Sequence, residues 1–119
     1  FSEAEPWIRA DDGDAYCAET QQADENSVWS AYAALIALRK AHPALVYGGF
    51  EPADGGREDV FCYFRGDGQE RFYIEVNLCA RTIRRPKRHE ELELVFSNYM
   101  AAGDGLQPYE ANVYRVAGR

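Results

Sequence analysis

Residues 28–46 read VWSAYAALIALRKAHPALV, and within this stretch the chain changes from a helical to a strand-forming pattern. Ahead of Pro43 the apolar residues recur at helical spacing, so we predict a helix over residues 24–40. Asp24 suits the N-cap position, and the positive charges of Arg39 and Lys40 suit the last turn. Because Pro43 prevents the helix from continuing, a different kind of structure is expected after it.

The apolar surface of this predicted helix is wide. Its large apolar residues are Val28, Trp29, Tyr32, Leu35 and Ile36, and Ala33 and Ala37 extend the surface round the cylinder. A helix on the surface of a globular protein has a narrower apolar face. We therefore expect this helix to be covered on more than one side.

Beyond Ala44 the apolar residues alternate with a period of two, which is typical of β-strands. Five runs are expected to be strands: 46–47, 59–65, 71–78, 91–96 and 111–116. Their inward side chains are expected to be Val60, Cys62, Phe64, Phe72, Ile74, Val76, Leu78, Leu92, Leu94 and Phe96. Turn signals such as Gly66-Asp67-Gly68 separate the runs. The pattern predicts a mainly β chain, an antiparallel Greek-key β-sandwich preceded by one α-helix.

The composition is that of a globular protein with an acidic surface. The 119 residues carry a net charge of −7, which disfavours nucleic acid as a partner. The sequence shows neither an apolar run that could span a membrane nor a signal-peptide pattern. Cys17, Cys62 and Cys79 have the spacing of neither a zinc site nor a disulfide framework, which favours a reducing, cytoplasmic setting.

Two charged loops are candidates for a binding site. The acidic loop contains Asp11, Asp12, Asp14 and Glu19, and the basic loop contains Arg81, Arg84, Arg85, Lys87, Arg88 and His89. The acidic loop lacks the spacing of a calcium-binding EF-hand. We interpret both loops as solvated, with the basic one paired with Glu90, Glu91 and Glu93. No metal or cofactor site is therefore expected.

Histidine and aromatic side chains are the remaining candidates. His42 has no partners for a catalytic triad and is expected to hold the turn before Pro43. Most of the aromatic residues, Trp7, Trp29, Tyr47, Tyr73 and Tyr114 among them, are expected to pack in a core or interface. Tyr99 and Tyr109 lie beside turns and are the best candidates for contact with a sugar ring.

Several segments, in order along the chain, resemble a known family. ALRKAHPALVYGGF at 37–50 and LQPYEA at 106–111 are the most specific. FSEAEPWI at 1–8, DENSV at 24–28, DVFCY at 59–63, VNL at 76–78 and FSNY at 96–99 also fit. Together they resemble the C-terminal region of glycoside hydrolase family 13, in the oligo-1,6-glucosidase and α-glucosidase group.

The resemblance implies a division of the chain and a function. Residues 1–23 would be an irregular arm from the end of a (β/α)8 barrel, 24–43 its last helix, and 44–119 an all-β C-terminal domain. Val28, Trp29, Tyr32, Leu35 and Ile36 would then pack on the barrel. The family's retaining mechanism needs two catalytic carboxylates, and none of its catalytic motifs occurs in this sequence.

The chain alone is therefore expected to be inactive, as the structural domain of an enzyme that hydrolyses α-glucosidic bonds in carbohydrate metabolism. Its partner would be the catalytic barrel, and the first residue, Phe1 rather than Met, favours a piece of something longer. The uncovered helix would also favour self-association. The alternative is an independent carbohydrate-binding or protein-interaction sandwich.

Overall fold

The structure, a computed structural model, describes residues 3–4, 16–100 and 103–118. The chain forms two compact units, Phe1–Ala33 and Ala34–Arg119. The boundary between them falls inside helix α2 (Val28–Ala41), so the N-terminal half of this helix belongs to the first unit and the rest to the second.

Two features of the first unit differ from expectation. The region expected to be irregular up to residue 23 contains a short helix, α1 (Ala18–Ala23). Helix α2 begins at Val28 because Ser27, rather than Asp24, caps it: the Ser27 hydroxyl accepts a hydrogen bond from the Ser30 amide at 3.1 Å. The Asp24 carboxylate instead accepts the Asn26 amide at 2.9 Å, which makes a turn ahead of the helix.

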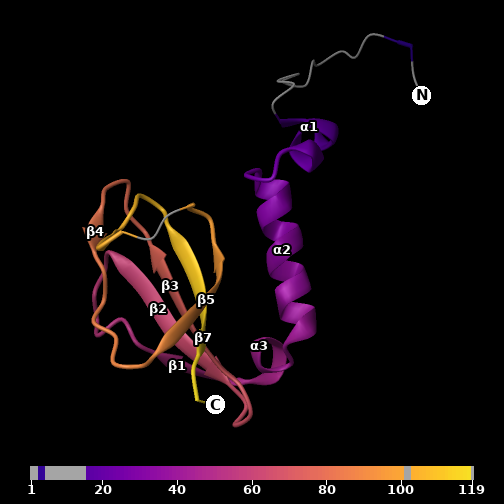
Figure 1. Ribbon diagram of the computed structural model, residues 1–119. Coiled ribbons are helices and arrows are strands. Elements are labelled where there is room, and N and C mark those ends of the chain that lie inside the picture. The colour runs from indigo at the N-terminus through magenta and orange to yellow at the C-terminus, as the bar shows by residue number, and fades with distance from the viewer. Residues whose placement is uncertain (1–2, 5–15, 101–102, 119) are drawn as a thin grey trace. The chain divides into compact units, whose positions relative to one another are not determined.

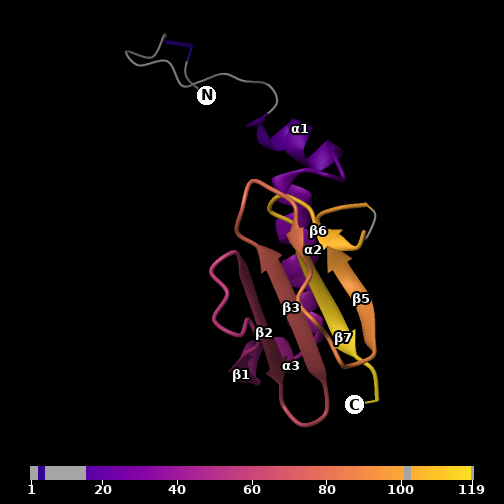
Figure 2. The same ribbon diagram turned by 90° about the vertical axis from the view of Figure 1, so that its left-hand side faces the viewer.

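The second unit is built on a five-stranded antiparallel sheet (Figure 1). Its strands are β1 (Gly49–Pro52), β2 (Val60–Gly66), β3 (Arg71–Asn77), β5 (Leu92–Ser97) and β7 (Ala111–Val116). Figure 2 shows their order across the sheet, β1-β2-β3-β7-β5. The last strand thus returns to lie between β3 and β5, the kind of return connection found in a Greek key. The predicted mainly β, antiparallel architecture is confirmed.

The predicted strand at 46–47 is wrong. These residues belong to a helical turn, α3 (Ala44–Tyr47), which Pro43 starts: its carbonyl accepts the amide of Tyr47 at 2.8 Å. The first strand begins after Gly48, where a Cβ atom would lie 2.2 Å from the Ala44 carbonyl oxygen. Only glycine therefore allows the chain to pass this closely from α3 into β1.

Each face of the sheet has its own core. One core consists of Val60, Cys62, Tyr73, Ile83, Leu106, Tyr114 and Val116. It is closed by a small second sheet, β4 (Ile83–Arg84) paired with β6 (Gly105–Leu106), which the sequence pattern did not predict. The other core consists of Ala44, Phe72, Ile74 and Val113, and Leu38 of α2 and Leu45 of α3 pack on it. We call the first the closed face and the second the helix face.

Burial on both faces changes several expected side-chain positions. In β3 the side chains of Phe72 and Ile74 pack on the helix face, as expected. Glu75, the next residue along the strand, points to the opposite, closed face and is fully buried there. Leu78 lies beyond the strand end and is exposed. Leu94 is also exposed, and the β-bulge between Leu94 and Phe96 places Phe96 on the helix face, opposite to Leu92.

Candidate docking surface and buried ion cluster

The apolar residues of α2 are the main exposed feature of the chain. In the first unit Val28 is 68% exposed and Tyr32 66%, and Trp29 is also exposed. In the second unit Ile36 is 50% exposed and Leu35 38%. These are the five side chains expected to pack on a barrel. Large apolar groups held in water are unfavourable, so their exposure indicates a surface that another layer is meant to cover.

An aromatic cluster on the outer edge of the sheet extends the exposed apolar surface of the second unit. The ring of Phe50 in β1 lies 4.9 Å from that of Tyr63 in β2, and the ring of Phe61 lies 5.2 Å from Tyr63. Phe50 and Phe61 are exposed, and Tyr63 packs on the helix-face core. The sequence contained a signal for this cluster, since Phe61 and Tyr63 alternate with the buried Val60 and Cys62.

The closed face contains a buried ion cluster centred on Arg85. Its guanidinium donates to Glu75, to the hydroxyl of Tyr114 at 3.0 Å, and to Glu110 at 3.5 Å. Glu75 and Glu110 are 0% and 1% exposed, and Asn112 donates to both carboxylates. The two buried carboxylates are thus paired with Arg85 and with neutral donors, and Arg88 lies 3.9 Å from Glu75.

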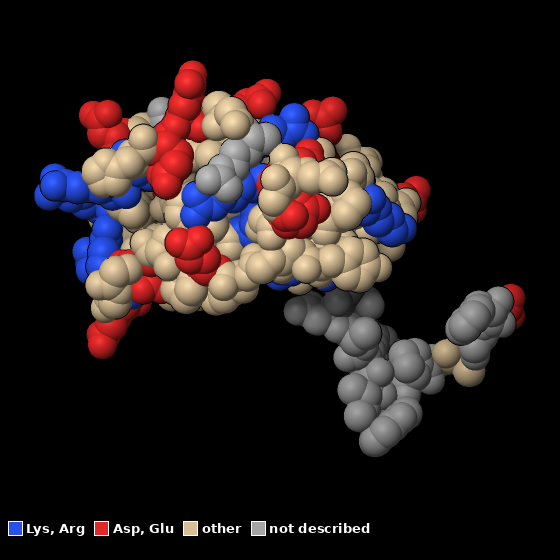
Figure 3. Space-filling view, turned by 90° about the horizontal axis from the view of Figure 1, so that it is seen from below, with Lys and Arg blue, Asp and Glu red and all other residues tan. Residues whose placement is uncertain are grey.

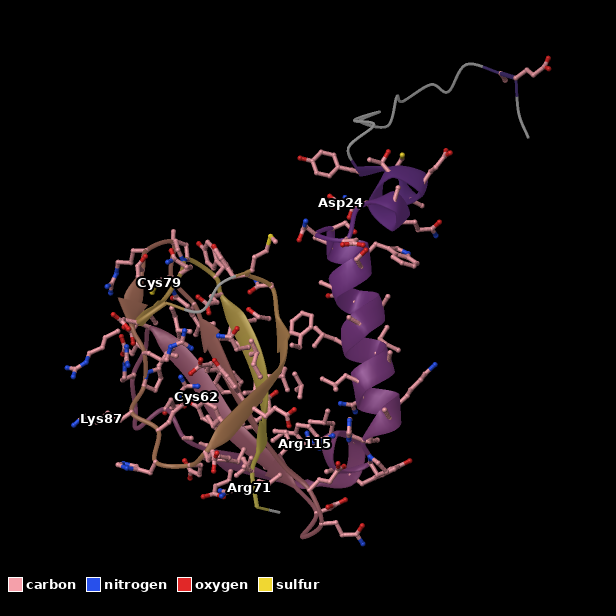
Figure 4. All side chains as sticks on the ribbon, viewed as in Figure 1. Asp24, Cys62, Arg71, Cys79, Lys87 and Arg115 are labelled. Atoms are coloured by element: carbon pink, nitrogen blue, oxygen red, sulfur yellow. The ribbon has the colours of Figure 1, made fainter. Side chains whose placement is uncertain are left out.

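The basic loop is therefore only partly solvated. Lys87, labelled in Figure 4, is exposed, as expected, but Arg85 and Arg88 point inward to Glu75 rather than to Glu90, Glu91 and Glu93. The expectation that acidic residues lie on the surface is likewise wrong for Glu75 and Glu110. The spacing of charges along the sequence cannot show that the partner of Arg85 lies on a strand ten positions earlier.

Burial governs the ionisation of the side chains on the closed face. Burial raises the pKa of Tyr73 well above the ordinary value for tyrosine, and it also raises the pKa of Tyr114. Burial also raises the pKa of the Cys62 thiol. Burial alone would lower the pKa of Arg85, but the charges of Glu75 and Glu110 outweigh it and raise that pKa. Arg85 thus stays charged while Tyr73, Tyr114 and Cys62 stay neutral, so these residues have a structural role.

A second polar cluster holds the corner between α2 and α3. His42 Nδ1 lies 3.0 Å from both carboxylate oxygens of Glu70, and its ring meets Phe72 edge-on. Arg115 of β7, labelled in Figure 4, donates to His42 Nε2 at 3.4 Å and lies 3.7 Å from Glu70. His42 thus lies at the turn before Pro43 and also joins that turn to strands β3 and β7.

The two tyrosines proposed for sugar contact lie at one corner of the structure. The Tyr99 hydroxyl donates to the carbonyl of Pro108 at 2.7 Å, so this polar group is already used within the fold. Tyr109 is 59% exposed, and its backbone has a φ of 55°, in the left-handed region. Asn98 fastens the two segments by donating to the Tyr109 carbonyl at 3.0 Å.

The other candidates give no binding site within the part of the chain that the structure describes. Asp11, Asp12 and Asp14 of the acidic loop, and Trp7, lie outside the described residues. Among the residues that are described, no group of three or more metal-ligating side chains occurs, and no helix has the length and apolar character needed to cross a membrane. Cys17, Cys62 and Cys79 are free thiols.

The surface charge is mixed on the face shown in Figure 3. Acidic and basic side chains are interspersed there with uncharged ones. Recognition of a nucleic-acid backbone uses a stripe of basic residues, and the described residues visible on this face do not form one. The expectation of no nucleic-acid partner stays a prediction.

Comparisons with known proteins identify relatives of the whole chain. An α-glucosidase of Candida albicans is 31% identical over 98% of this chain and 21% of its own length. An oligo-1,6-glucosidase of Bacillus cereus is 28% identical, with 98% of this chain and 23% of the relative covered. No family model matches the chain.

Solved structures show the same relationship. An isomaltulose synthase of Klebsiella sp. LX3 superposes with a TM-score of 0.84 at 28% identity, over 98% of this chain and 22% of that one. The chain thus spans about a fifth of the length of the relatives that it matches. By sequence and by fold, the chain belongs to glycoside hydrolase family 13. It corresponds to the C-terminal region of enzymes of the oligo-1,6-glucosidase and α-glucosidase group.

Proposed function

We propose that this chain is the non-catalytic C-terminal region of an α-glucosidase-like enzyme that hydrolyses α-glucosidic bonds in carbohydrate metabolism. Residues 1–23 form an arm from the end of the barrel domain, 24–43 its last helix, and 44–119 the C-terminal β domain. The observation that carries the proposal is the exposure of Val28, Tyr32 and Ile36 on the helix that precedes the β domain. The last helix of a (β/α)8 barrel packs on strands and on neighbouring helices, which accounts for a wide apolar surface.

The role of this region is to cover and stabilise the catalytic barrel. A retaining glycosidase needs two accessible carboxyl groups about 5 Å apart, one on each side of the scissile bond. On the closed face the neighbouring carboxylates Glu75 and Glu110 are buried and paired with Arg85, so they have no access to a sugar. A reducing, cytoplasmic setting suits the buried free thiol of Cys62.

A hydrolysis assay tests the absence of catalysis. The purified 119-residue chain is incubated with nitrophenyl α-glucoside and with isomaltose, and an active oligo-1,6-glucosidase serves as the positive control. We expect no product above the buffer blank. Hydrolysis that follows the chain through purification would contradict the proposal.

The alternative is an independent carbohydrate-binding module, and the exposed ring of Tyr109 is the observation that favours it. Calorimetric titration with maltose, isomaltose and dextrin distinguishes the two functions. The structural role predicts no heat of binding at millimolar sugar. Binding that is lost in Tyr109→Ala and retained in Tyr47→Ala, at a second exposed tyrosine, would favour the module instead.

A further inference from the structure

A groove in the second unit separates the end of α2 from the helix face of the sheet. It has a volume of about 280 Å³. Leu35 and Leu38 of α2 form one wall, and Ile74, Phe96 and Val113 of the sheet form the opposite one. Leu38 packs on the helix-face core below, while Leu35 is 38% exposed. The groove is therefore an apolar depression open to the surface.

Two arginines also line this groove, and its lining contains no carboxylate. Arg39 donates to the carbonyl of Leu45 at 3.1 Å, and Arg65 donates to the carbonyl of Val46 at 3.2 Å. Both acceptors are neutral, so within the described residues neither guanidinium charge is paired with an acid. The Nε of Arg65 is moreover buried without a hydrogen-bond partner.

Several other arginines in the same unit are paired with acids. Arg57, Arg71 and Arg115 each lie within ion-pair distance of a carboxylate, at 2.9, 2.9 and 3.7 Å respectively. The chain has 20 acidic residues against 13 basic ones, so acids are plentiful. The two unpaired guanidinium groups beside an apolar depression are therefore complementary to an occupant that brings its own acid.

From these observations we propose that the groove receives an apolar peptide segment carrying one carboxylate, which pairs with Arg39 and Arg65. This inference rests on the proposed function, because it takes the segment from the same polypeptide. The relatives are far longer than this chain, which covers only 21–23% of them, so most of such a polypeptide lies outside it. The apolar walls of the groove contact the side chains of the segment, and the planar guanidinium groups of Arg39 and Arg65 bind its carboxylate.

Displacement of an anionic apolar dye tests this proposal on the 119-residue chain. Anilinonaphthalene sulfonate is bound first and is then displaced by a short apolar peptide with one central glutamate, or by the same peptide with glutamine. We expect the glutamate peptide to compete about tenfold better, the effect of one well-placed charge pair. Equal competition by the two peptides would overturn the proposal.

Three variants assign the effect to the groove. Arg39→Gln and Arg65→Gln each remove a groove charge, and we expect each to abolish the advantage of the glutamate peptide. Arg71→Gln removes an arginine that lies outside the groove and is expected to preserve that advantage. Arg39 is exposed on its helix, so Arg39→Gln keeps the fold, which a thermal melt checks. An advantage that persists in both groove variants would refute the assignment.

Decanoate, a small apolar acid, separates a peptide occupant from a lipid-like one. We expect it to compete more weakly than the glutamate peptide. Decanoate that displaces the dye when the glutamate peptide does not would overturn the peptide assignment. The result of this displacement experiment does not depend on the hydrolysis assay. A failed displacement would contradict only the groove proposal, whereas hydrolysis by the chain would contradict the proposed function.

Discussion

The two faces of the five-stranded sheet are covered in different ways. The closed face is complete: the small β4–β6 sheet covers it, and Arg85 neutralises the carboxylates beneath. The helix face is covered only in part, by α3 and the end of α2, and it leaves Phe50 and Phe61 exposed at its edge. Among the described residues, the closed face is thus covered more completely than the helix face.

This difference separates the contacts that stabilise the fold from the surfaces that remain free for assembly. The charged members of the buried cluster, Arg85, Glu75 and Glu110, all lie in this chain, so we expect the closed face to form without a second surface. Exposed apolar groups need no internal partner and gain stability only from a second surface. Substitutions on the closed face should therefore affect folding, and those on the helix face should affect assembly.

The largest expected effect is at the centre of the ion cluster. Replacing Arg85 by leucine removes the cation that Glu75 and Glu110 share, with Arg88 still 3.9 Å from Glu75, and we expect it to lower the free energy of unfolding by about 3–5 kcal/mol. Urea denaturation measures the loss. The exposed neighbour is the control, since Arg84→Leu should change stability by less than about 0.5 kcal/mol. Similar losses at both positions would show that the cluster has no special role.

A pair of apolar truncations compares the two faces directly. Leu106 is 0% exposed on the closed face, and Leu106→Ala should cost about 2–5 kcal/mol of unfolding free energy. Phe61 is 41% exposed at the aromatic edge, and we expect Phe61→Ala to cost less than about 1 kcal/mol, within the range of surface changes. Equal costs in urea denaturation would mean that the edge already belongs to a complete core.

Alkaline pH should weaken the closed face through its buried tyrosines. Burial holds the pKa of Tyr73 and of Tyr114 above their ordinary value, so the folded chain keeps protons that the unfolded chain loses. Stability is therefore full below about pH 10 and falls above it, by about 1.4 kcal/mol per pH unit for each tyrosine. Measuring unfolding at several pH values checks this. The loss should become less steep in Tyr73→Phe and remain unchanged in Tyr47→Phe, because Tyr47 is exposed.

The smallest expected effect is at Tyr109, in the turn that precedes β7. Its φ of 55° suits asparagine better than a residue with a bulky Cβ, so Tyr109→Asn should raise the free energy of unfolding by about 0.5 kcal/mol. Tyr109→Val should lower it by about 1 kcal/mol, because a β-branched residue is strained there. A loss of stability in Tyr109→Asn would indicate that the ring itself packs in the fold.

The elements with a sustained period could be predicted from the sequence. Alternation located β2, β3, β5 and β7, and the helical spacing located α2, each within a few residues of its observed bounds. The two-residue strands β4 and β6 are too short to show a period, and residues 46–47 were misread because a helical turn after proline is equally apolar.

Side-chain sites were harder to predict than elements. The exposed stripe of α2 followed from helical geometry alone, so Tyr32 and Ile36 could be singled out before the structure. The ion cluster could not, because Arg85 and Glu75 meet only through the tertiary packing of β4 on β3. The groove could not either, since its walls come from α2 and from non-consecutive strands.

Sedimentation of the 119-residue chain at high micromolar concentration tests most directly whether the exposed face of α2 is an assembly surface. We predict that the chain forms dimers or larger species, because the described residues leave the apolar side chains of α2 exposed. Ile36→Glu should make it monomeric without lowering its melting temperature, while Lys40→Glu, which places a glutamate at a charged position of the same helix, should leave it associated. If the chain is monomeric at every concentration and Ile36→Glu behaves in the same way, the exposed face of α2 is not an assembly surface.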